Sequence, residues 1–241
     1  MTHVSVLLHE AIEGLSLQDG DVVIDATLGN GGHTLGMLNT GKDIHIIGMD
    51  LDQEAIERAK KRIGSNNRVR YIEGSYRNLE KTLQEIHVQP TKVLFDFGFS
   101  TNQIEESGRG FSFQKDEPLL MTFSSNPKDT ELTAHEIVNT WEEDTIRTIL
   151  KLYGEERFAG RIAKAIIRAR EKKVILSTTE LVNVILAATP VTYHRMKIHP
   201  ATKTFQALRI ATNDELSAVV EGIETAFRLL SSKGRIAAIS F

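Results

Sequence analysis

The stretch VVIDATLGNGGHTLGML, residues 22–38, decides the fold because an apolar segment passes through a glycine cluster into a helical pattern. The β-branched run that ends at Asp25 is typical of a buried parallel strand. Glycines between positions 29 and 32 permit a tight turn and allow a ligand to lie against the main chain. The stretch therefore predicts the first strand–turn–helix unit of a doubly wound α/β sheet, with a ligand site at the turn.

The same alternation continues through the first hundred residues, where short β-branched segments are separated by helical ones. The clearest helix follows Asp52, a predicted N-cap, and ends at Gly64, a predicted C-cap. Strands that alternate with helices indicate a mostly parallel sheet. The expected strands are residues 21–27, 43–50, 69–74, 92–98 and 235–241.

After Gly98 the strand pattern stops, and helical patterns dominate as far as residue 203. A further helical stretch runs from about residue 204 to 231. We therefore predict an α/β domain made of residues 1–102 and 204–241, with an inserted, all-helical domain at residues 103–203. The helices expected in the insertion are 131–141, 143–153, 155–172 and 178–188.

The composition limits the class of protein. Of the 241 residues 41% are apolar and 25% charged, which is typical of a globular protein. No apolar run is long enough for a membrane helix, and the first residues lack the basic region of a signal peptide. The absence of cysteine excludes disulfides and thiolate metal sites, and the eight histidines have no metal-site spacing. We expect a cytoplasmic protein with neither a bound metal nor a membrane partner.

The net charge of −3 is unevenly distributed. Residues 151–203 contain eleven Lys and Arg but four acids, so this segment carries +7 and the rest of the chain −10. Basic side chains recur at helical spacing within the segment 155–172, opposite an apolar face. A solvated helix face is the usual interpretation, but the surplus of positive charge favours contact with phosphates. The residues concerned are Arg157, Arg161, Lys164 and Arg168.

The glycine turn differs from the one that dinucleotide enzymes use. Thr34 occupies the place of the third glycine in G-x-G-x-x-G, and Asp25 introduces an acid into the preceding strand. Asp50 ends the second strand, where a carboxylate can bind both hydroxyls of a ribose. These features fit an adenosyl ligand without a pyrophosphate, such as S-adenosylmethionine. The alternative is a tight turn in which the strand-end acid only caps a helix.

The fourth strand ends in Asp96, at the edge of the sheet where ligands of such folds bind. In an amine methyltransferase this carboxylate accepts an N–H and aims the nitrogen lone pair at the methyl group; contact with the cofactor alone is the other interpretation. Arg109, Phe111 and Phe113 follow in a glycine-containing loop. We expect the rings to stack on a base and Arg109 to contact a phosphate, although rings that only anchor the loop are an equal alternative.

Several motifs resemble those of a known family over the whole chain. They are IDATLGNGGHT, DLDQEAIERAK, DFGFSTNQIEESGRGFSF, YGEERFAGRIAKAI, HPATKTFQALRIATNDEL and GRIAAISF. In this order they resemble the MraW family of bacterial ribosomal RNA small-subunit methyltransferases. The resemblance implies a class I, Rossmann-like methyltransferase fold, S-adenosyl-L-methionine as cofactor, and methylation of N4 of a cytosine in small-subunit ribosomal RNA. The cofactor contacts that it implies are Gly31, Gly32, His33, Asp50, Tyr76, Asp96 and Gln103.

The chain departs from the family pattern at several places. Tyr76 replaces a phenylalanine, EPLLMTFS at 117–124 replaces a more acidic segment, and the family's segment beyond ISF is missing. Two alternatives to the main prediction therefore remain: a related nucleic-acid amino-methyltransferase with another target, and a non-catalytic fragment that binds cofactor and RNA. The sequence leaves open whether the partner is naked RNA or the assembled small subunit, and whether the chain forms a homodimer.

Overall fold

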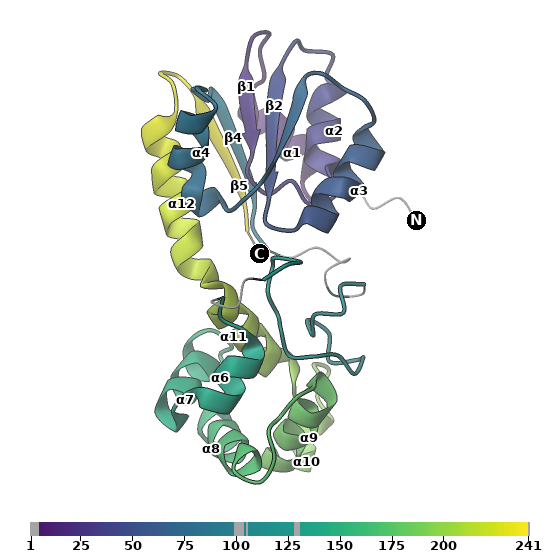
Figure 1. Ribbon diagram of the computed structural model, residues 1–241, viewed down its shortest axis with the longest axis vertical. Coiled ribbons are helices and arrows are strands. Elements are labelled where there is room, and N and C mark those ends of the chain that lie inside the picture. Colours follow the sequence, from purple (N-terminus) through teal and green to yellow (C-terminus); the bar gives the residue numbers. More distant parts are fainter. Residues whose placement is uncertain (1–4, 99–103, 105, 128–130, 241) are drawn as a thin grey trace. The chain divides into compact units, whose positions relative to one another are not determined.

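The computed structural model describes residues 5–98, 104, 106–127 and 131–240 (Figure 1). The chain divides into two compact units. The first contains Met1–Gly98 and Leu216–Phe241, and the second contains Phe99–Glu215.

The first unit alternates strands and helices. Its elements are α1 (Leu8–Leu15), β1 (Val22–Asp25), α2 (Gly32–Leu38), β2 (His45–Asp50), α3 (Gln53–Ile63), β3 (Val69–Glu73), α4 (Leu79–Glu85), β4 (Lys92–Asp96), α12 (Glu215–Leu229, from its second residue) and β5 (Arg235–Ile239). All five predicted strands are present. The predicted caps of α3 are also confirmed, since the Asp52 side chain accepts the Glu54 N–H at 3.1 Å and Gly64 has a φ of 73°.

The five strands form one parallel sheet in the order β3-β2-β1-β4-β5. The chain moves outward from β1 through β2 to β3, then returns to place β4 on the other side of β1. This order is that of a doubly wound, Rossmann-like α/β fold, as predicted. The switch point lies between β1 and β4, and ligands of such sheets bind beyond the carboxyl ends of the strands at that point.

Helices cover both faces of the sheet, which explains why its strands are apolar runs rather than alternating patterns. On one face, side chains such as Val23 and Leu94 pack against α1 and α2. On the other, Ile24, Val93 and Phe95 pack against α4 and α12. Successive residues of a strand therefore contribute to the cores on opposite faces of the sheet. The same alternation determines the face toward which each strand-end side chain points.

In the second unit, residues 106–127 form turns and bends, and helices follow from Ala134. The described residues of this unit form no strand apart from an isolated bridge between Pro118 and Ser177. Its helices are α6 (Ala134–Thr140), α7 (Glu143–Leu152), α8 (Ala159–Arg170), α9 (Thr178–Ala188), α10 (Val191–His194) and α11 (Thr202–Asn213). They enclose one core of buried aliphatic residues. Ser177 caps the start of α9, with its Oγ accepting the Glu180 N–H at 3.4 Å. Along the described part of the chain, no helix has the length and apolarity that a membrane crossing requires.

The structure differs from the prediction of a single helical stretch at 204–231. Helix α11 ends at Asn213, Asp214 adopts a left-handed φ of 45°, and α12 starts at Glu215. Across this break Arg209 donates two hydrogen bonds to the carboxylate of Glu215, at 2.7 and 3.0 Å. Because α11 packs on α6 and α7, the second unit extends to Glu215. The unit comprises Phe99–Glu215, whereas the sequence led us to expect residues 103–203.

Candidate functional site

Three carboxylates lie at the carboxyl ends of adjacent strands in the first unit. Asp25 ends β1, Asp50 ends β2 and Asp96 ends β4. Because β2, β1 and β4 are parallel neighbours, these residues share one edge of the sheet, and Asp25 and Asp96 flank the switch point. The edge therefore combines negative charge with the place where this class of sheet binds ligands.

Asp50 organises the turn that follows β1. Its Oδ2 accepts the Gly29 N–H at 2.7 Å, and its Oδ1 accepts the Asp52 N–H at 2.9 Å. A carboxylate has about four acceptor positions, so two more donors can be accommodated. Burial raises the pKa of Asp50 to about 6, although the two N–H donors stabilise the carboxylate and act to lower the pKa. The carboxylate is thus fixed in place and can still accept from a ligand.

Asp25 is buried, with 1% of its surface exposed. The Thr34 hydroxyl donates to its Oδ2 at 2.6 Å, whereas Oδ1 has no hydrogen-bond partner among the described residues. Burial raises the pKa of Asp25, against the opposing effect of the Thr34 hydrogen bond. This contact explains why a threonine replaces the third glycine of the dinucleotide pattern. The pairing of Asp25 with Thr34 was not predicted from the sequence. The available signal was an acid nine positions before a hydroxyl residue, across a strand and a turn.

His33 and Asp96 lie close together near the switch point. The ring nitrogen Nε2 of His33 is 3.1 Å from the Val6 carbonyl oxygen, which assigns a proton to Nε2. Nδ1 then faces Asp96, with 3.8 Å between Nδ1 and Oδ2. The Asp96 backbone N–H donates to the Thr27 hydroxyl at 2.6 Å, which anchors the end of β4 to the residues after β1. The carboxylate of Asp96 is 28% exposed, so a ligand can reach it.

The glycine turn is required by contacts within the protein. Gly31 has a left-handed φ of 71°, and a Cβ there would lie 3.0 Å from the Ala59 Cβ of α3. A Cβ on Gly32 would overlap the Ser5 hydroxyl. Packing within the protein therefore explains why both positions are glycine. The turn that they form lies beside Asp25 and Asp50.

Tyr76 follows β3 in a short 3₁₀ turn, Tyr76–Asn78. Its ring makes edge-to-face contacts with Phe95 and Phe97, with centroids 5.7 and 5.8 Å apart. A Cβ on Gly222 of α12 would lie 2.6 Å from the Tyr76 ring, so the glycine provides the space for that ring. The ring is therefore fixed on the α12 side of the sheet. Gln103, which the family resemblance implied as a further cofactor contact, lies outside the described residues.

In the second unit, Arg109 has a different role from the expected phosphate contact. Only 5% of the residue is exposed, and its guanidinium donates to the carbonyl oxygens of Thr122 and Phe123 at 3.1 and 2.7 Å. A buried guanidinium that binds main-chain carbonyls stabilises the loop. The prediction of a phosphate contact at Arg109 is therefore corrected to a structural role.

The two loop phenylalanines also have partners within the unit. Phe111 stacks on Phe123, with ring centroids 6.0 Å apart, and Phe113 stacks on His199 at 4.6 Å. Phe113 additionally makes an edge contact with Phe205 of α11. Both rings pack against the helical core. These contacts match the alternative interpretation, in which the two rings anchor the loop to the rest of the unit.

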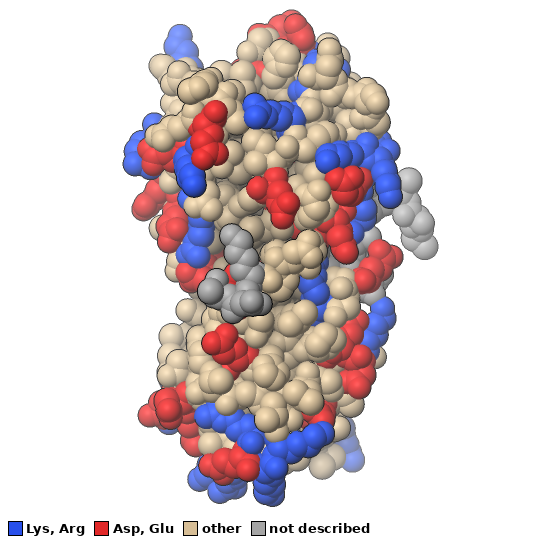
Figure 2. Space-filling view, viewed as in Figure 1, with Lys and Arg blue, Asp and Glu red and all other residues tan. Residues whose placement is uncertain are grey.

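The basic residues of the α8 region are exposed, as predicted from their spacing. Among the described residues, Arg161, Lys164 and Arg168 have no ion pair, while Arg170 donates to the Val138 and Trp141 carbonyl oxygens. Arg157 lies over the rings of Phe158 and Tyr193, with its guanidinium carbon 4.6 and 5.5 Å from the centroids. In Figure 2, blue side chains gather at the end of the second unit where α8 and α9 lie. This surface is suited to a polyanion.

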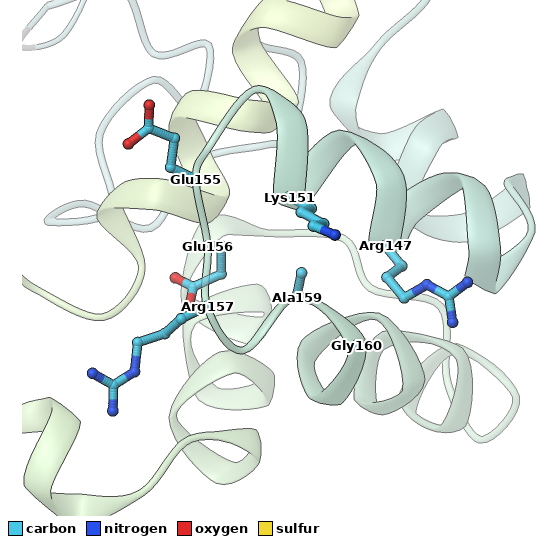
Figure 3. A pocket seen from close by; sticks show the side chains of 7 residues that line it. All are labelled: Arg147, Lys151, Glu155, Glu156, Arg157, Ala159 and Gly160. Atoms are coloured by element: carbon cyan, nitrogen blue, oxygen red, sulfur yellow. The ribbon is translucent and has the colours of Figure 1, made fainter.

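A shallow pocket of about 530 Å³ lies beside this surface, between the end of α7 and the start of α8 (Figure 3). Its cationic side chains are Arg147 and Lys151 from α7 and Arg157 from the loop before α8. Figure 3 shows that Arg157 points away from Lys151. Glu155 and Glu156 also line the pocket. The mixture of charges means that this pocket is not by itself an anion site.

A family model and curated relatives match this chain along its length. The model of the MraW methylase family matches residues 1–241. A ribosomal RNA small subunit methyltransferase H from Sulfurihydrogenibium sp. is 43% identical, over 99% of this chain and 81% of its own length. The protein of that name from Carboxydothermus hydrogenoformans is 42% identical, over 100% of this chain and 76% of its own length.

A solved rRNA methylase from Streptococcus thermophilus is similar over 40% of this chain and 58% of its own, with 22% identity and a TM-score of 0.33. The family match and the curated relatives extend along both units, whereas this structural similarity is partial. The chain therefore belongs to the MraW methylase family, methyltransferases whose cofactor is S-adenosyl-L-methionine.

Proposed function

We propose that this chain transfers a methyl group from S-adenosyl-L-methionine to N4 of a cytosine in small-subunit ribosomal RNA. The observation that carries the proposal is the row of strand-end carboxylates Asp50, Asp25 and Asp96, beside a glycine turn at the switch point of the sheet. The names of the relatives support ribosomal RNA as the substrate. The cytosine N4 target rests on the family resemblance of the motifs.

The residues at the edge fit the cofactor chemically. Asp50 has acceptor positions left for the two ribose hydroxyls after binding two backbone N–H groups. The buried Oδ1 of Asp25 has no partner among the described residues, and a cationic ligand would offset the cost of burying that charge. We assign the main chain of Gly31, Gly32 and His33 to the methionine part and the Tyr76 ring to the adenine. Gln103 remains a further proposed contact.

Asp96 is the proposed catalytic residue. When bound, the cofactor supplies an electrophilic methyl group. The N4 amine of cytosine is a weak nucleophile because its lone pair is delocalised into the ring. Asp96 would accept one N–H of this amine, orient the lone pair toward the methyl carbon and take the proton that the amine loses on methylation. His33, held through Nε2, keeps its Nδ1 directed at this carboxylate.

The second unit supplies a surface for RNA in this proposal. Arg157, Arg161, Lys164 and Arg168 are exposed cations on or beside one helix. Of these, Arg157 is stacked on two aromatic rings, so less side-chain entropy is lost when its guanidinium binds a phosphate. Arg109 is left out of this surface because its guanidinium is buried. Phosphate contacts of this kind position RNA without reading its sequence.

The direct test is transfer of labelled methyl to small ribosomal subunits that lack cytosine N4 methylation. We expect label in N4-methylcytosine with the parent chain and none with Asp96→Ala. Calorimetric titration of S-adenosyl-L-methionine into both proteins is the control, since Asp96→Ala should retain measurable cofactor binding through Asp50.

Three outcomes would contradict the proposal in different ways. Label in another nucleotide would favour a related amino-methyltransferase with a different target. Cofactor binding without any label would favour a binding role without turnover. Label that persists in Asp96→Ala would exclude Asp96 as the group that accepts the amine proton.

A further inference from the structure

A half-buried phenylalanine and an exposed histidine form a stacked pair of rings in the second unit. The Phe113 and His199 rings have centroids 4.6 Å apart and planes within 12° of each other. Phe113 is in turn fixed by an edge contact with Phe205 of α11, with the two planes 82° apart. Phe113 therefore covers one face of the imidazole, while His199 as a residue remains exposed. The exposed surface of the imidazole is then its opposite face and its edge.

The His199 ring is fixed in orientation as well as position. Its Nδ1 accepts the Ala201 N–H at 3.2 Å, which leaves a proton on Nε2 in the neutral ring. Partial burial, with a smaller contribution from His194, lowers the pKa of His199, so the ring is neutral near pH 7. A flat, neutral and immobilised ring loses little entropy when another flat group stacks on it.

The segment that leads to His199 is exposed and basic. Arg195 and Lys197 are exposed and have no ion pair among the described residues. Met196 and Ile198 are 54% and 56% exposed, although both are apolar. Exposed cations interleaved with apolar and aromatic side chains are the combination with which proteins bind single-stranded nucleic acid.

We infer that His199, supported from beneath by Phe113, is a stacking platform for an unpaired base of the RNA substrate, with Arg195 and Lys197 placed for the adjoining phosphates. The inference rests on the proposed function for the identity of the substrate. In this arrangement the base contacts the His199 ring, and Phe113 supports that ring from the other side. RNA recognition commonly uses unstacked bases held against aromatic or imidazole rings.

Three substitutions at one position separate stacking from other roles. His199→Ala removes the ring, His199→Leu covers Phe113 without an aromatic face, and His199→Phe keeps a flat ring. None of them can accept the Ala201 N–H, so any loss of that hydrogen bond is common to all three. Thr192→Ala is the matched control, because Thr192 is exposed on α10, shortly before the same loop, and is not part of the proposed contact. If His199→Ala unfolds, as judged by circular dichroism, the Leu and Phe variants alone decide the question.

The experiment measures binding of a short single-stranded RNA of mixed sequence that carries a 2-aminopurine reporter, whose fluorescence is quenched on stacking. We expect His199→Ala and His199→Leu to weaken binding about tenfold and to lose the quenching. His199→Phe should remain within about twofold of the parent, and Thr192→Ala should be unchanged. In methyl transfer to small subunits, His199→Leu should raise KM and leave kcat unchanged.

Equal affinity of His199→Leu and the parent would overturn the inference, as would equal weakening by Leu and Phe. Weaker binding to intact small subunits with unchanged binding to the RNA would indicate a ribosomal protein as the partner instead, and would also overturn it. Failure of the parent chain to methylate small subunits is a separate result, since it refutes the proposed function whatever the order of the RNA affinities.

Discussion

The sheet edge of the first unit and the basic surface of the second differ in how their polar groups are satisfied. At the edge, Asp50 binds two backbone N–H groups and Asp25 binds Thr34, and both have raised pKa values. On the α8 surface, Arg161 and Lys164 are exposed without an ion pair among the described residues. Buried groups are positioned by the fold, whereas exposed ones depend on their partner for orientation.

This difference determines what a substitution should do in each region. A change at the edge alters the folded state itself, because a buried polar group loses its partner. A change on the basic surface should leave stability almost unaffected and alter binding in a salt-dependent way. Arg109 tests this distinction. Its charge suggests a residue whose replacement affects binding, but its burial predicts that replacement affects stability.

The largest effect should come from Thr34→Val, which removes the hydroxyl that donates to the buried Asp25 carboxylate. We expect the free energy of unfolding at about pH 8 to fall by about 3 kcal/mol, as for breaking a buried charge-assisted hydrogen bond. Urea denaturation measures the loss. Thr34→Ser, which keeps the hydroxyl, should lose less than about 1 kcal/mol.

The pH dependence of that loss provides a second check. Burial already holds the folded pKa of Asp25 above its unfolded value, so the folded state binds the proton more tightly. Stability from this group therefore increases as pH falls through the folded pKa. The difference between Thr34→Val and parent should shrink at lower pH. A difference that is constant with pH would show that the ionised carboxylate is not the cause.

The next effect separates two arginines of the second unit. Arg109→Ala should lower the free energy of unfolding by about 2 kcal/mol, because two carbonyl oxygens lose a charged donor. Arg161→Ala should change it by less than about 0.5 kcal/mol. Denaturant melts of both variants measure this. If Arg109→Ala is fully stable and binds RNA more weakly, the sequence-based phosphate role of Arg109 is correct after all.

A smaller effect is expected on the pH dependence of cofactor affinity. Asp50 must be ionised to accept from both ribose hydroxyls, and its pKa in the free protein is about 6. Because that value is above the unfolded one, lowering the pH favours the folded state through this group while it disfavours binding. The Kd for S-adenosyl-L-methionine should rise about tenfold between about pH 7.5 and pH 5.

Asp50→Asn provides the control for this titration. It should bind more weakly at all pH values and lose the part of the pH dependence that Asp50 causes, while Asp25 continues to contribute. A pH profile identical to that of the parent would assign the titration to other groups.

The smallest effect concerns single cations on α8. Replacing Arg161, Lys164 or Arg168 by Ala should each reduce the slope of log K against log salt by about 0.7 for single-stranded RNA. Affinity measured over a series of KCl concentrations gives the slope. Lys81→Ala, on an exposed side chain of α4 in the first unit, is the matched control and should leave the slope unchanged. Slopes that are equal in all four variants would remove α8 from the proposed RNA surface.

The periodic parts of the fold were predictable from the sequence. Strands buried on both faces are continuous apolar runs, and the helix at 53–63 has both its caps, Asp52 and Gly64, in the local sequence. The end of α11 was not predictable, because Asp214 adopts a left-handed conformation within a helical pattern. There the packing of α11 and the Arg209–Glu215 ion pair decide the course of the chain, and neither is visible in a local pattern.

The candidate site was predictable where position along a strand determines it. Asp25, Asp50 and Asp96 each end a strand, and the parallel topology then requires a common edge. The roles of Thr34 and Arg109 depend on contacts between distant parts of the chain. Charge alone suggested a ligand contact for Arg109, but the fold uses its guanidinium to bind the carbonyl oxygens of residues thirteen and fourteen positions away.

The central claim is that the strand-end carboxylates of the first unit bind the cofactor. Calorimetric titration of S-adenosyl-L-methionine at about pH 7.5 into the parent, Asp50→Asn and Arg161→Ala tests it most directly. We predict one site per chain in the parent, a Kd about 100-fold higher in Asp50→Asn, and no change in Arg161→Ala. An unchanged Kd in Asp50→Asn, with the protein folded, would contradict the claim.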